Sequence, residues 1–420
     1  MGYLNHTGAH QIYADRRMKK VLIIAQYFPP AGGVGTFRVT KFVKFLRQYG
    51  WDPVVLTVAP EYYVADGWPQ DTSLLNDLPA DLKIYRTRIM SARLFNDPGI
   101  RWLPYLVLRL GELLKAEKPD LVYLTGDPFI PLTAAPIIRL MHPLRYIIDL
   151  RDPWKLAHTD YSRLSFRQRM GSAISKMLEP WVIRSSAKTI CVSKQMCASY
   201  RKEYKNLPDS HFTVITNGYD PDDYKGISPE QFTGFTIVYT GKFETGENFR
   251  NPLTLFKSLK RLNQRGMHIR FVHVGAIEQR IVDMADDAGI SSQVEFRGWL
   301  PYYEALAHAK GADLLLVLGG GQASEQTGKI FDYIACNRPI LALANQESDI
   351  SRIVMNVPHS ICLDQPTEDT LTEALIKAYN RDMESSMEWT GPQIYDRRIL
   401  TKKLCDIFNE VLDEKPDLGA

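Results

Sequence analysis

The sequence predicts an α/β protein made of two doubly wound domains, each a parallel β-sheet covered by helices. Apolar runs of strand length alternate with helical segments along most of the chain, and the alternation starts again near residue 236. The 420 residues exceed what a single hydrophobic core serves, so two domains of roughly 150–220 residues are expected. Glycine-rich or charged segments follow several apolar runs, at the positions where doubly wound domains bind ligands.

The first domain is expected to begin with a strand at 20–26, an apolar run that a loop rich in glycine and proline ends at 27–36. A helix at 37–49 follows, because its apolar residues repeat at helical spacing. Further apolar runs and amphipathic segments continue the alternation. The expected strands are 53–58, 121–124, 146–150, 189–192 and 213–216, and the expected helices are 131–141 and 161–185.

The second domain repeats the pattern, with expected strands at 236–240, 269–274, 294–297 and 314–318 and expected helices at 252–264, 277–288 and 302–310. Strands that alternate with helices predict parallel sheets with right-handed crossovers. A last helix is expected at 396–413. The order of these elements predicts a first domain at 19–228, a second at 229–385 and a C-terminal segment at 386–420. Residues 1–18 fit no element and are expected to form a disordered extension.

Composition argues against several classes of protein. No apolar run reaches the ~20 residues that span a bilayer, and no secretory signal precedes the first strands. Five cysteines, without a CxxC pair, predict reduced thiols in a cytoplasmic protein and argue against a disulfide framework or a zinc site. The nine histidines show no metal-ligand spacing, so no metal is predicted.

The glycine loop at 32–35 follows the first strand and opens the first helix. Its spacing does not fit G-x-G-x-x-G, because Arg38 stands where a third glycine belongs, and no acidic residue ends the strand 53–58. A nicotinamide enzyme is therefore disfavoured. Gly33 and Gly35 are predicted instead to let a substrate approach backbone N–H groups at the helix start, although a tight turn explains at least one glycine.

The segment TGKIFDYIACNRPILAL, at 327–343, is the strongest functional signal in the chain. Thr327 and Gly328 begin a helix, and Lys329 in its first turn adds a positive charge, which together favour a phosphate site. Asp332 lies on the same face and can accept two hydrogen bonds from a vicinal diol such as a ribose. The simpler alternative is an amphipathic helix with a surface Lys–Asp pair.

Seven segments, in order, resemble glycosyltransferase family 4, the retaining enzymes of the GT-B fold. They are KKVLIIAQYFPPAGGVGTFRVTKFVKFLRQYGWDPVVLT, YIIDLRDPW, AKTICVSKQM, FTVITNGYDPDDY, IVYTGKF, VEFRGWLPYYEALAHAKGADLLLVL and TGKIFDYIACNRPILAL. The resemblance implies two Rossmann-like domains that face a cleft, with the C-terminal helix crossing back to the first domain. It also implies a nucleotide-sugar donor on the second domain, an acceptor on the first, and no metal.

The resemblance assigns roles to residues of the second domain. Asp332 occupies the place of the second acid of the family's paired-glutamate motif and is expected to bind the ribose. Ser324 replaces the first acid, so Glu325 or the backbone at Gly320 and Gly321 is expected to contact the donor sugar. Lys242 and Arg250 would hold the diphosphate together with Lys329. The nucleobase would lie near Gly298 and Trp299.

Charged residues after the strand 146–150 form the candidate catalytic group. Asp149 or Asp152 would orient the acceptor hydroxyl, and Arg151 would pair with a phosphate or hold these acids. The alternative is an Arg–Asp pair that only fixes the loop. The acids Asp220, Asp222 and Asp223 follow a turn signal, so a turn or helix cap is favoured over a metal site.

The basic helix expected at 161–186 lies in the most positive part of the chain. Residues 139–205 hold 14 Lys and Arg against 5 Asp and Glu. A basic amphipathic helix of this kind either lies on an anionic membrane or packs on the core with a solvated basic face. The membrane interpretation would favour a lipid-linked acceptor. Nucleic acid is disfavoured as a partner, because no stacking aromatics are interleaved with these charges.

The sequence thus predicts a cytoplasmic retaining glycosyltransferase that acts in cell-surface polysaccharide biosynthesis. Under the membrane interpretation of the basic helix, it is also peripheral at the inner face of the membrane. Its acceptor would be a saccharide or a lipid-linked sugar. Two alternatives remain open: a sugar-nucleotide epimerase on the same fold, and a non-catalytic nucleotide-sugar binding protein, since the paired-acid motif is degenerate at Ser324.

Overall fold

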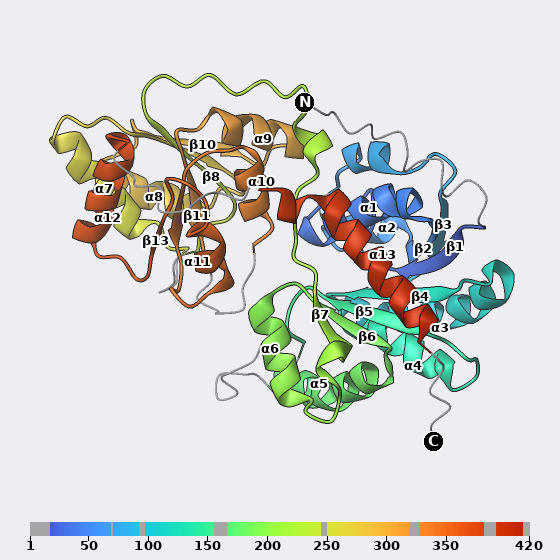
Figure 1. Cartoon of the computed structure of the whole chain (residues 1–420). Coiled ribbons are helices and arrows are strands. Elements are labelled where there is room, and N and C mark those ends of the chain that lie inside the picture. Colours follow the sequence, from blue (N-terminus) through green and yellow to red (C-terminus); the bar gives the residue numbers. More distant parts are fainter. Residues whose placement is uncertain are drawn as a thin grey trace, which may run out of the picture. The chain divides into compact units, whose positions relative to one another are not determined.

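A computed structural model describes residues 17–68, 70–91, 97–154, 166–244, 250–319, 327–381 and 392–414. The chain divides into an N-terminal unit, Met1–Thr216 with Arg397–Ala420, and a C-terminal unit, Asn217–Asp396 (Figure 1). The expected boundaries were 228/229 and 385/386. In both units the strands run parallel and helices cover the sheet, so the predicted pair of doubly wound α/β domains is confirmed.

The N-terminal sheet has seven described strands in the order β3-β2-β1-β4-β5-β6-β7, all paired in parallel. The strands are β1 (Lys19–Ile24), β2 (Trp51–Val58), β3 (Lys83–Thr87), β4 (Leu121–Gly126), β5 (Tyr146–Leu150), β6 (Lys188–Cys191) and β7 (Phe212–Val214). The helices are α1 (Val34–Leu46), α2 (Pro60–Ala65), α3 (Pro98–Glu117), α4 (Ala134–Arg139), α5 (Phe166–Ser185), α6 (Lys194–Glu203) and α13 (Arg397–Asp413). Short 3₁₀ helices are η1 (Arg47–Tyr49), η2 (Ser73–Asp77), η3 (Ile130–Thr133) and η5 (Asp209–His211).

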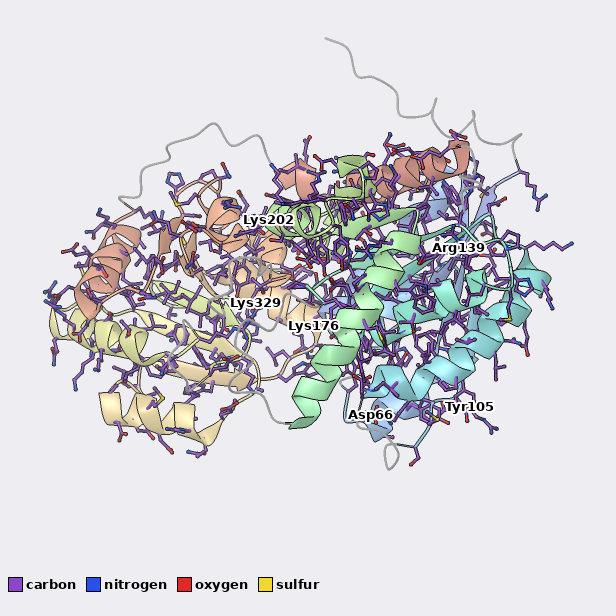
Figure 2. All side chains as sticks on the ribbon, turned by 90° about the horizontal axis from the view of Figure 1, so that it is seen from below. Asp66, Tyr105, Arg139, Lys176, Lys202 and Lys329 are labelled. Carbon is purple, nitrogen blue, oxygen red and sulfur yellow. The ribbon has the colours of Figure 1, made fainter. Side chains whose placement is uncertain are left out.

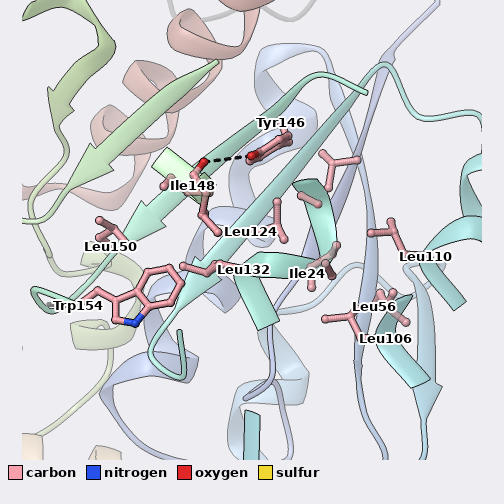
Figure 3. Close-up of a cluster of buried hydrophobic side chains, with 14 of the residues drawn as sticks. Ile24, Leu56, Leu106, Leu110, Leu124, Leu132, Tyr146, Ile148, Leu150 and Trp154 are labelled. Carbon is pink, nitrogen blue, oxygen red and sulfur yellow. Dashed lines mark hydrogen bonds between the residues drawn. The ribbon is translucent and has the colours of Figure 1, made fainter. Parts of the chain in front are cut away.

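Two apolar layers hold this unit together, one on each face of the sheet. The layer in Figure 3 joins side chains from β1, β2, β4 and β5, such as Ile24, Leu124 and Ile148, to Leu106 and Leu110 of α3. Strands buried on both faces explain why β1, β4 and β5 are nearly continuous apolar runs in the sequence.

The C-terminal helix α13 belongs to the N-terminal unit, as predicted, and packs on α1. The ring of Phe408 lies 5.0 Å from that of Trp51 and 5.7 Å from that of Tyr123, both in edge contacts. Phe408 is fully buried, and Leu412 is partly buried against the same layer. These residues therefore act in packing, and they join the end of the chain to its first 150 residues.

The C-terminal sheet has six described strands in the order β10-β9-β8-β11-β12-β13, again parallel. The strands are β8 (Thr236–Thr240), β9 (Arg270–Val274), β10 (Val294–Gly298), β11 (Leu314–Leu318), β12 (Ile340–Leu343) and β13 (Ile361–Leu363). The helices are α7 (Leu253–Gln264), α8 (Gln279–Ala288), α9 (Tyr302–Gly311), α10 (Lys329–Ala335), α11 (Asp349–Val354) and α12 (Glu368–Tyr379), with 3₁₀ helices η6 (Pro221–Tyr224) and η7 (Pro392–Tyr395).

Some elements differ from their prediction. Helix α1 begins at Val34 rather than 37, and the expected helix 131–141 is divided into η3 and α4. The 20-residue helix α3 was not predicted, although Asp97 caps it by accepting a hydrogen bond from the N–H of Ile100 at 2.9 Å. Pro104 lies inside α3, and because proline usually ends a helix, the sequence does not predict a helix across this segment.

Candidate functional site

Each sheet has one position where the strand order reverses, and ligands of doubly wound domains bind beside it, past the carboxyl ends of the strands. In the N-terminal unit this position lies between β1 and β4, and in the C-terminal unit between β8 and β11. The predicted residues Gly33, Gly35 and Arg151 follow β1 and β5, and Lys242 and Lys329 follow β8 and β11.

In the N-terminal unit, the Arg151 guanidinium lies against the glycine loop at the start of α1. A Cβ on Gly35 would collide with Nη1 of Arg151, so only glycine lets the cation sit there. Arg151 Nε donates to the Gly126 carbonyl at 3.0 Å, and Nη2 donates to the carbonyl of Asp127. Gly33 has a φ of 96°, a backbone conformation that favours glycine. The structure thus brings three predicted residues, Gly33, Gly35 and Arg151, into one loop cluster.

Two carboxylates accompany Arg151 at the ends of β4 and β5. Both carboxylates are exposed, and partial loss of hydration raises the pKa of each above the ordinary range, while the charge of Arg151 opposes the rise. Removal of water likewise lowers the pKa of Arg151. Asp127 was not predicted from the sequence, although it directly follows a buried strand. A carboxyl group of raised pKa beside a cation is the kind of group that orients a hydroxyl.

Asp149 lies beneath this cluster and is fully buried. Its Oδ2 accepts from Arg38 Nε at 2.7 Å and from the Tyr123 hydroxyl at 2.5 Å, and its Oδ1 accepts from Arg38 Nη2 at 2.8 Å. Arg38 also donates to the carbonyls of Ile215 and Thr216, both at 2.9 Å. Burial would lower the pKa of Arg38, but the Asp149 carboxylate outweighs it and raises this pKa. We therefore interpret Asp149 as a residue that holds the end of β5, and not as one that touches an acceptor.

An aromatic pair also covers the glycine loop, and the sequence analysis missed it. The rings of Tyr27 and Trp68 stack with centroids 4.1 Å apart, and Trp68 Nε1 donates to the Gly32 carbonyl at 2.8 Å. Tyr27 directly follows the strand expected at 20–26, which is a signal that the sequence offered. Trp68 comes from the segment after α2, and only the tertiary structure shows that it reaches the loop.

In the C-terminal unit, Lys329 lies directly over the end of β8. Its ammonium is 4.9 Å from the centroid of the Tyr239 ring, and a Cβ on Gly241 would collide with it. The carbonyl of Gly241 lies 2.8 Å from Nε2 of His273, and burial lowers the pKa of this histidine. Lys329 at the start of α10 and Gly241 after β8, predicted as parts of separate motifs, are therefore neighbours at the switch point.

The other two predicted cations are paired with carboxylates. Lys242 Nζ lies 3.1 Å from Glu278, and Arg250 Nη1 lies 2.8 Å from Glu244. Lys242 is exposed and adjoins Gly241, so its ammonium can exchange this surface partner for another anion. Gly275 supports the same loop, because a Cβ there would collide with the carbonyl of Gly241.

Asp332 is one turn into α10 and is partly buried. Its Oδ1 accepts from the Tyr224 hydroxyl at 2.7 Å and from the Tyr302 hydroxyl at 2.8 Å. Burial, followed by the charge of Asp332, raises the pKa of both tyrosines well above its ordinary value. Neither tyrosine was predicted as a site residue. Asp220 caps η6, the short helix that carries Tyr224, by accepting from the N–H of Asp222 at 3.0 Å, which confirms the expected turn or cap.

The remaining predicted residues lie at the edges of this region. Gly298 ends β10 with a φ of 75°, and the following Trp299 has 59% of its surface exposed. Gly328 is the N-cap of α10, directly after Thr327, and the cap is made without a side-chain hydrogen bond. Helix α10 ends at Ala335, and Asn337 takes a left-handed conformation that stops it. Gly320, Gly321 and Glu325 lie outside the described residues.

Residues 31–223 match the family model described as Glycosyltransferase Family 4. No curated protein sequence matches the chain.

Solved structures match almost the whole chain. A glycosyltransferase from Rickettsia africae ESF-5 is 12% identical over 95% of this chain and 100% of that one, with a TM-score of 0.67. Sucrose-phosphate synthase from Thermosynechococcus elongatus is 13% identical over 94% and 99%, with a TM-score of 0.68. Anabaena Alr3699/HepE in complex with UDP-glucose is 12% identical over 93% and 99%, with a TM-score of 0.62. At these identities the similarity establishes the fold.

Proposed function

We propose, from the match of residues 31–223 to the model of glycosyltransferase family 4, that this chain transfers a sugar with retention from a nucleoside-diphosphate-sugar to a saccharide or lipid-linked acceptor. The process it serves would be the cytoplasmic synthesis of a cell-surface polysaccharide. The observation that carries the proposal is the position of Lys329. Its ammonium lies over Gly241 at the switch point of the C-terminal sheet, three residues before Asp332.

In this proposal, Lys329 and Lys242 bind the diphosphate, which is the leaving group of the reaction. When the bond between the sugar C1 and the phosphate oxygen breaks, its electron pair stays on the diphosphate. Lys329, with Lys242 beside it, would stabilise the charge that builds there. Because these lysines supply positive charge, we propose that transfer needs no metal. In a retaining reaction the acceptor oxygen bonds to C1 on the same face, and its proton passes to the departing phosphate oxygen.

The acceptor would be oriented by the N-terminal unit. Asp127 and Asp152 offer carboxylate oxygens to acceptor hydroxyls, and Arg151 holds both loops in place through the carbonyls of Gly126 and Asp127. Of the three residues proposed from the sequence, Arg151 and Asp152 stay in the proposed acceptor site. Asp149 becomes the buried support of their strand.

Calorimetry with UDP, GDP, ADP, UDP-glucose and NAD⁺ on the full-length protein tests the donor site. We expect one nucleoside diphosphate to bind, and its affinity to fall at least about tenfold in Lys329→Ala, because a charge-assisted contact to phosphate is lost. UDP comes first, because the Anabaena protein of the same fold was solved with UDP-glucose. The control is Lys257→Ala, an exposed lysine on α7, which should bind as the wild type does, and EDTA should leave the affinity unchanged.

The alternatives give different results in the same samples. An epimerase would interconvert donor sugars without an acceptor, and a non-catalytic binding protein would bind the donor without releasing a nucleoside diphosphate. Binding of NAD⁺ in place of the nucleoside diphosphates, or equal binding by wild type and Lys329→Ala, would contradict the proposed donor site.

We further propose that the protein binds a membrane, on the evidence of exposed apolar side chains on the face formed by α4 and α5. Leu140 and Met141 at the end of α4 are 80% and 64% exposed, and Ile174, Met177 and Trp181 are exposed on one side of α5. Arg139 donates to the carbonyl of Ser185 and so ties the two helix ends together. Among the helices of the described residues, none combines the length and apolar character needed to cross a bilayer.

Cations border these apolar side chains, including Arg139 and Lys176, which are labelled in Figure 2, and Arg184. In α4 and the described side chains of α5, the only acid is Glu179, which is buried and accepts from Tyr204 at 2.6 Å. Exposed apolar side chains with cations on the same helices match an anionic lipid surface, with insertion below the phosphates. We therefore propose that this face lies on an anionic bilayer and that the acceptor is lipid-linked.

Sedimentation with vesicles of phosphatidylcholine, with and without phosphatidylglycerol, tests the membrane face. We expect the wild type to bind only the anionic vesicles, and Met177→Glu to lower the bound fraction about tenfold, since a carboxylate is forced to the lipid. The control is Met355→Glu, a similarly exposed methionine of the C-terminal unit. The proposal would be contradicted if both variants lost vesicle binding equally, or if the wild type bound vesicles with and without phosphatidylglycerol equally well.

A further inference from the structure

The carboxylate of Asp332 is held by two tyrosine hydroxyls that come from elements far apart in the sequence. Tyr224 ends η6 and Tyr302 begins α9, yet both donate to Oδ1 of Asp332, at 2.7 and 2.8 Å. Burial raises the pKa of both hydroxyls, so they remain protonated and act as donors at physiological pH. The oxygen of Asp332 is therefore always the acceptor in this arrangement.

Both tyrosines are fixed by the structure around them. Lys310 Nζ donates to the carbonyls of Tyr224, at 3.3 Å, and Ile227, at 2.7 Å, and this holds the segment after η6 on the end of α9. The Tyr219 ring meets the Tyr224 ring edge-on at 5.9 Å. Tyr302 is the first residue of α9 and follows Pro301. The hydroxyls therefore meet Asp332 from rigid positions, and the plane of the carboxylate is set before a ligand binds.

A carboxylate fixed in this way suits a vicinal diol. It has about four acceptor positions, so it can accept from ligand hydroxyls in addition to protein donors. Each hydroxyl–carboxylate bond is charge-assisted and short, and it loses strength when the carboxylate can turn away. A ligand that lacks one of the two hydroxyls leaves a partly desolvated carboxylate without that partner, which is a strong source of discrimination.

We propose that Tyr224 and Tyr302 are positioning residues for ribose recognition, and that they make the donor site select ribonucleotides over 2′-deoxyribonucleotides. The inference rests on the proposed function, because it assumes that Asp332 faces the ribose of the donor nucleotide. It adds the two tyrosine hydroxyls that orient this carboxylate toward the 2′ and 3′ hydroxyls of the ribose.

The test compares UDP with 2′-deoxy-UDP, and GDP with 2′-deoxy-GDP, by calorimetry on the full-length protein. We expect the wild type to bind the ribose form of its nucleotide about tenfold more tightly than the deoxy form. In Tyr302→Phe and Tyr224→Phe this ratio should fall to about threefold or less, while the affinity for the deoxy form stays nearly constant. If one variant fails to fold, judged by its melting curve, the other carries the test.

The matched control is Tyr379→Phe, in α12, whose ring packs against Phe235 with centroids 5.4 Å apart. It should keep the wild-type ratio. Equal losses of ribose and deoxy affinity in the Tyr302 variant would show a merely structural role and overturn the inference. So would a wild type that does not discriminate between the two sugars. If no nucleotide binds at all, the proposed function fails as well, whereas binding without discrimination overturns only the inference about ribose.

Discussion

Asparagine in place of Asp149 is expected to lower the free energy of unfolding of the N-terminal unit by about 3–5 kcal/mol. The buried Arg38 guanidinium would keep its charge but lose its counter-ion, and no water reaches it to compensate, since both side chains are fully buried. Calorimetry of the full-length protein should show the transition of this unit about 10 °C lower. The transition of the C-terminal unit should stay in place.

The control for this prediction is Asp406→Asn, the same chemical change in an exposed i,i+4 pair with Lys402 on α13. It should cost at most about 0.5 kcal/mol. A double variant, Arg38→Met with Asp149→Leu, should recover much of the lost stability, because it removes both charges together. If Asp149→Asn is no more costly than Asp406→Asn, the buried pair does not support the unit in the way described.

Alanine in place of Gly275 is expected to lower the affinity for the donor nucleotide at least about tenfold and to destabilise the C-terminal unit by about 1–3 kcal/mol. Its Cβ would collide with the carbonyl carbon and oxygen of Gly241. Backbone cannot move aside as the end of a flexible side chain can, so the loop that carries Gly241 and Lys242 must shift away from Lys329. Calorimetric titration with the nucleotide, and melting curves, measure the two effects.

Gly111→Ala is the matched control, because its Cβ would meet only Ile138, at an ordinary 3.7 Å, inside α3. It should leave nucleotide binding unchanged and stabilise the helix by about 0.5–1 kcal/mol, since alanine loses less conformational freedom than glycine. Wild-type affinity in Gly275→Ala would mean that the position of the Gly241 loop does not matter for the donor.

The fold was largely predictable, because its main signals are local. Strands such as β1, β5 and β11 are continuous or nearly continuous apolar runs, as is typical of parallel strands buried on both faces. Helix α13 was predicted almost to its ends from an apolar stripe. Helix α3 was not predicted. Asp97 is a good N-cap, but Pro104 seven residues later argues against a helix through this segment.

The candidate site was predictable only in part. Lys329 and Asp332 share one short segment, so their spacing along a helix already suggested phosphate and diol recognition. The buried role of Asp149 was not predictable, because its partner Arg38 is 111 residues away in the chain. The tyrosines that hold Asp332 lie 108 and 30 residues from it, and neither carries a local signal of function.

The sequence by itself determined the class of fold, the alternation of elements, and the motif at 327–343, because periodicity and loop chemistry act over a few residues. The tertiary structure alone decided which charges are buried, which glycines face a side chain, and which hydroxyls reach Asp332. Those facts depend on strand order, which brings β1 beside β4 and β8 beside β11 across long stretches of chain. The switch points form there, and with them the places where Arg151 and Lys329 meet their glycines.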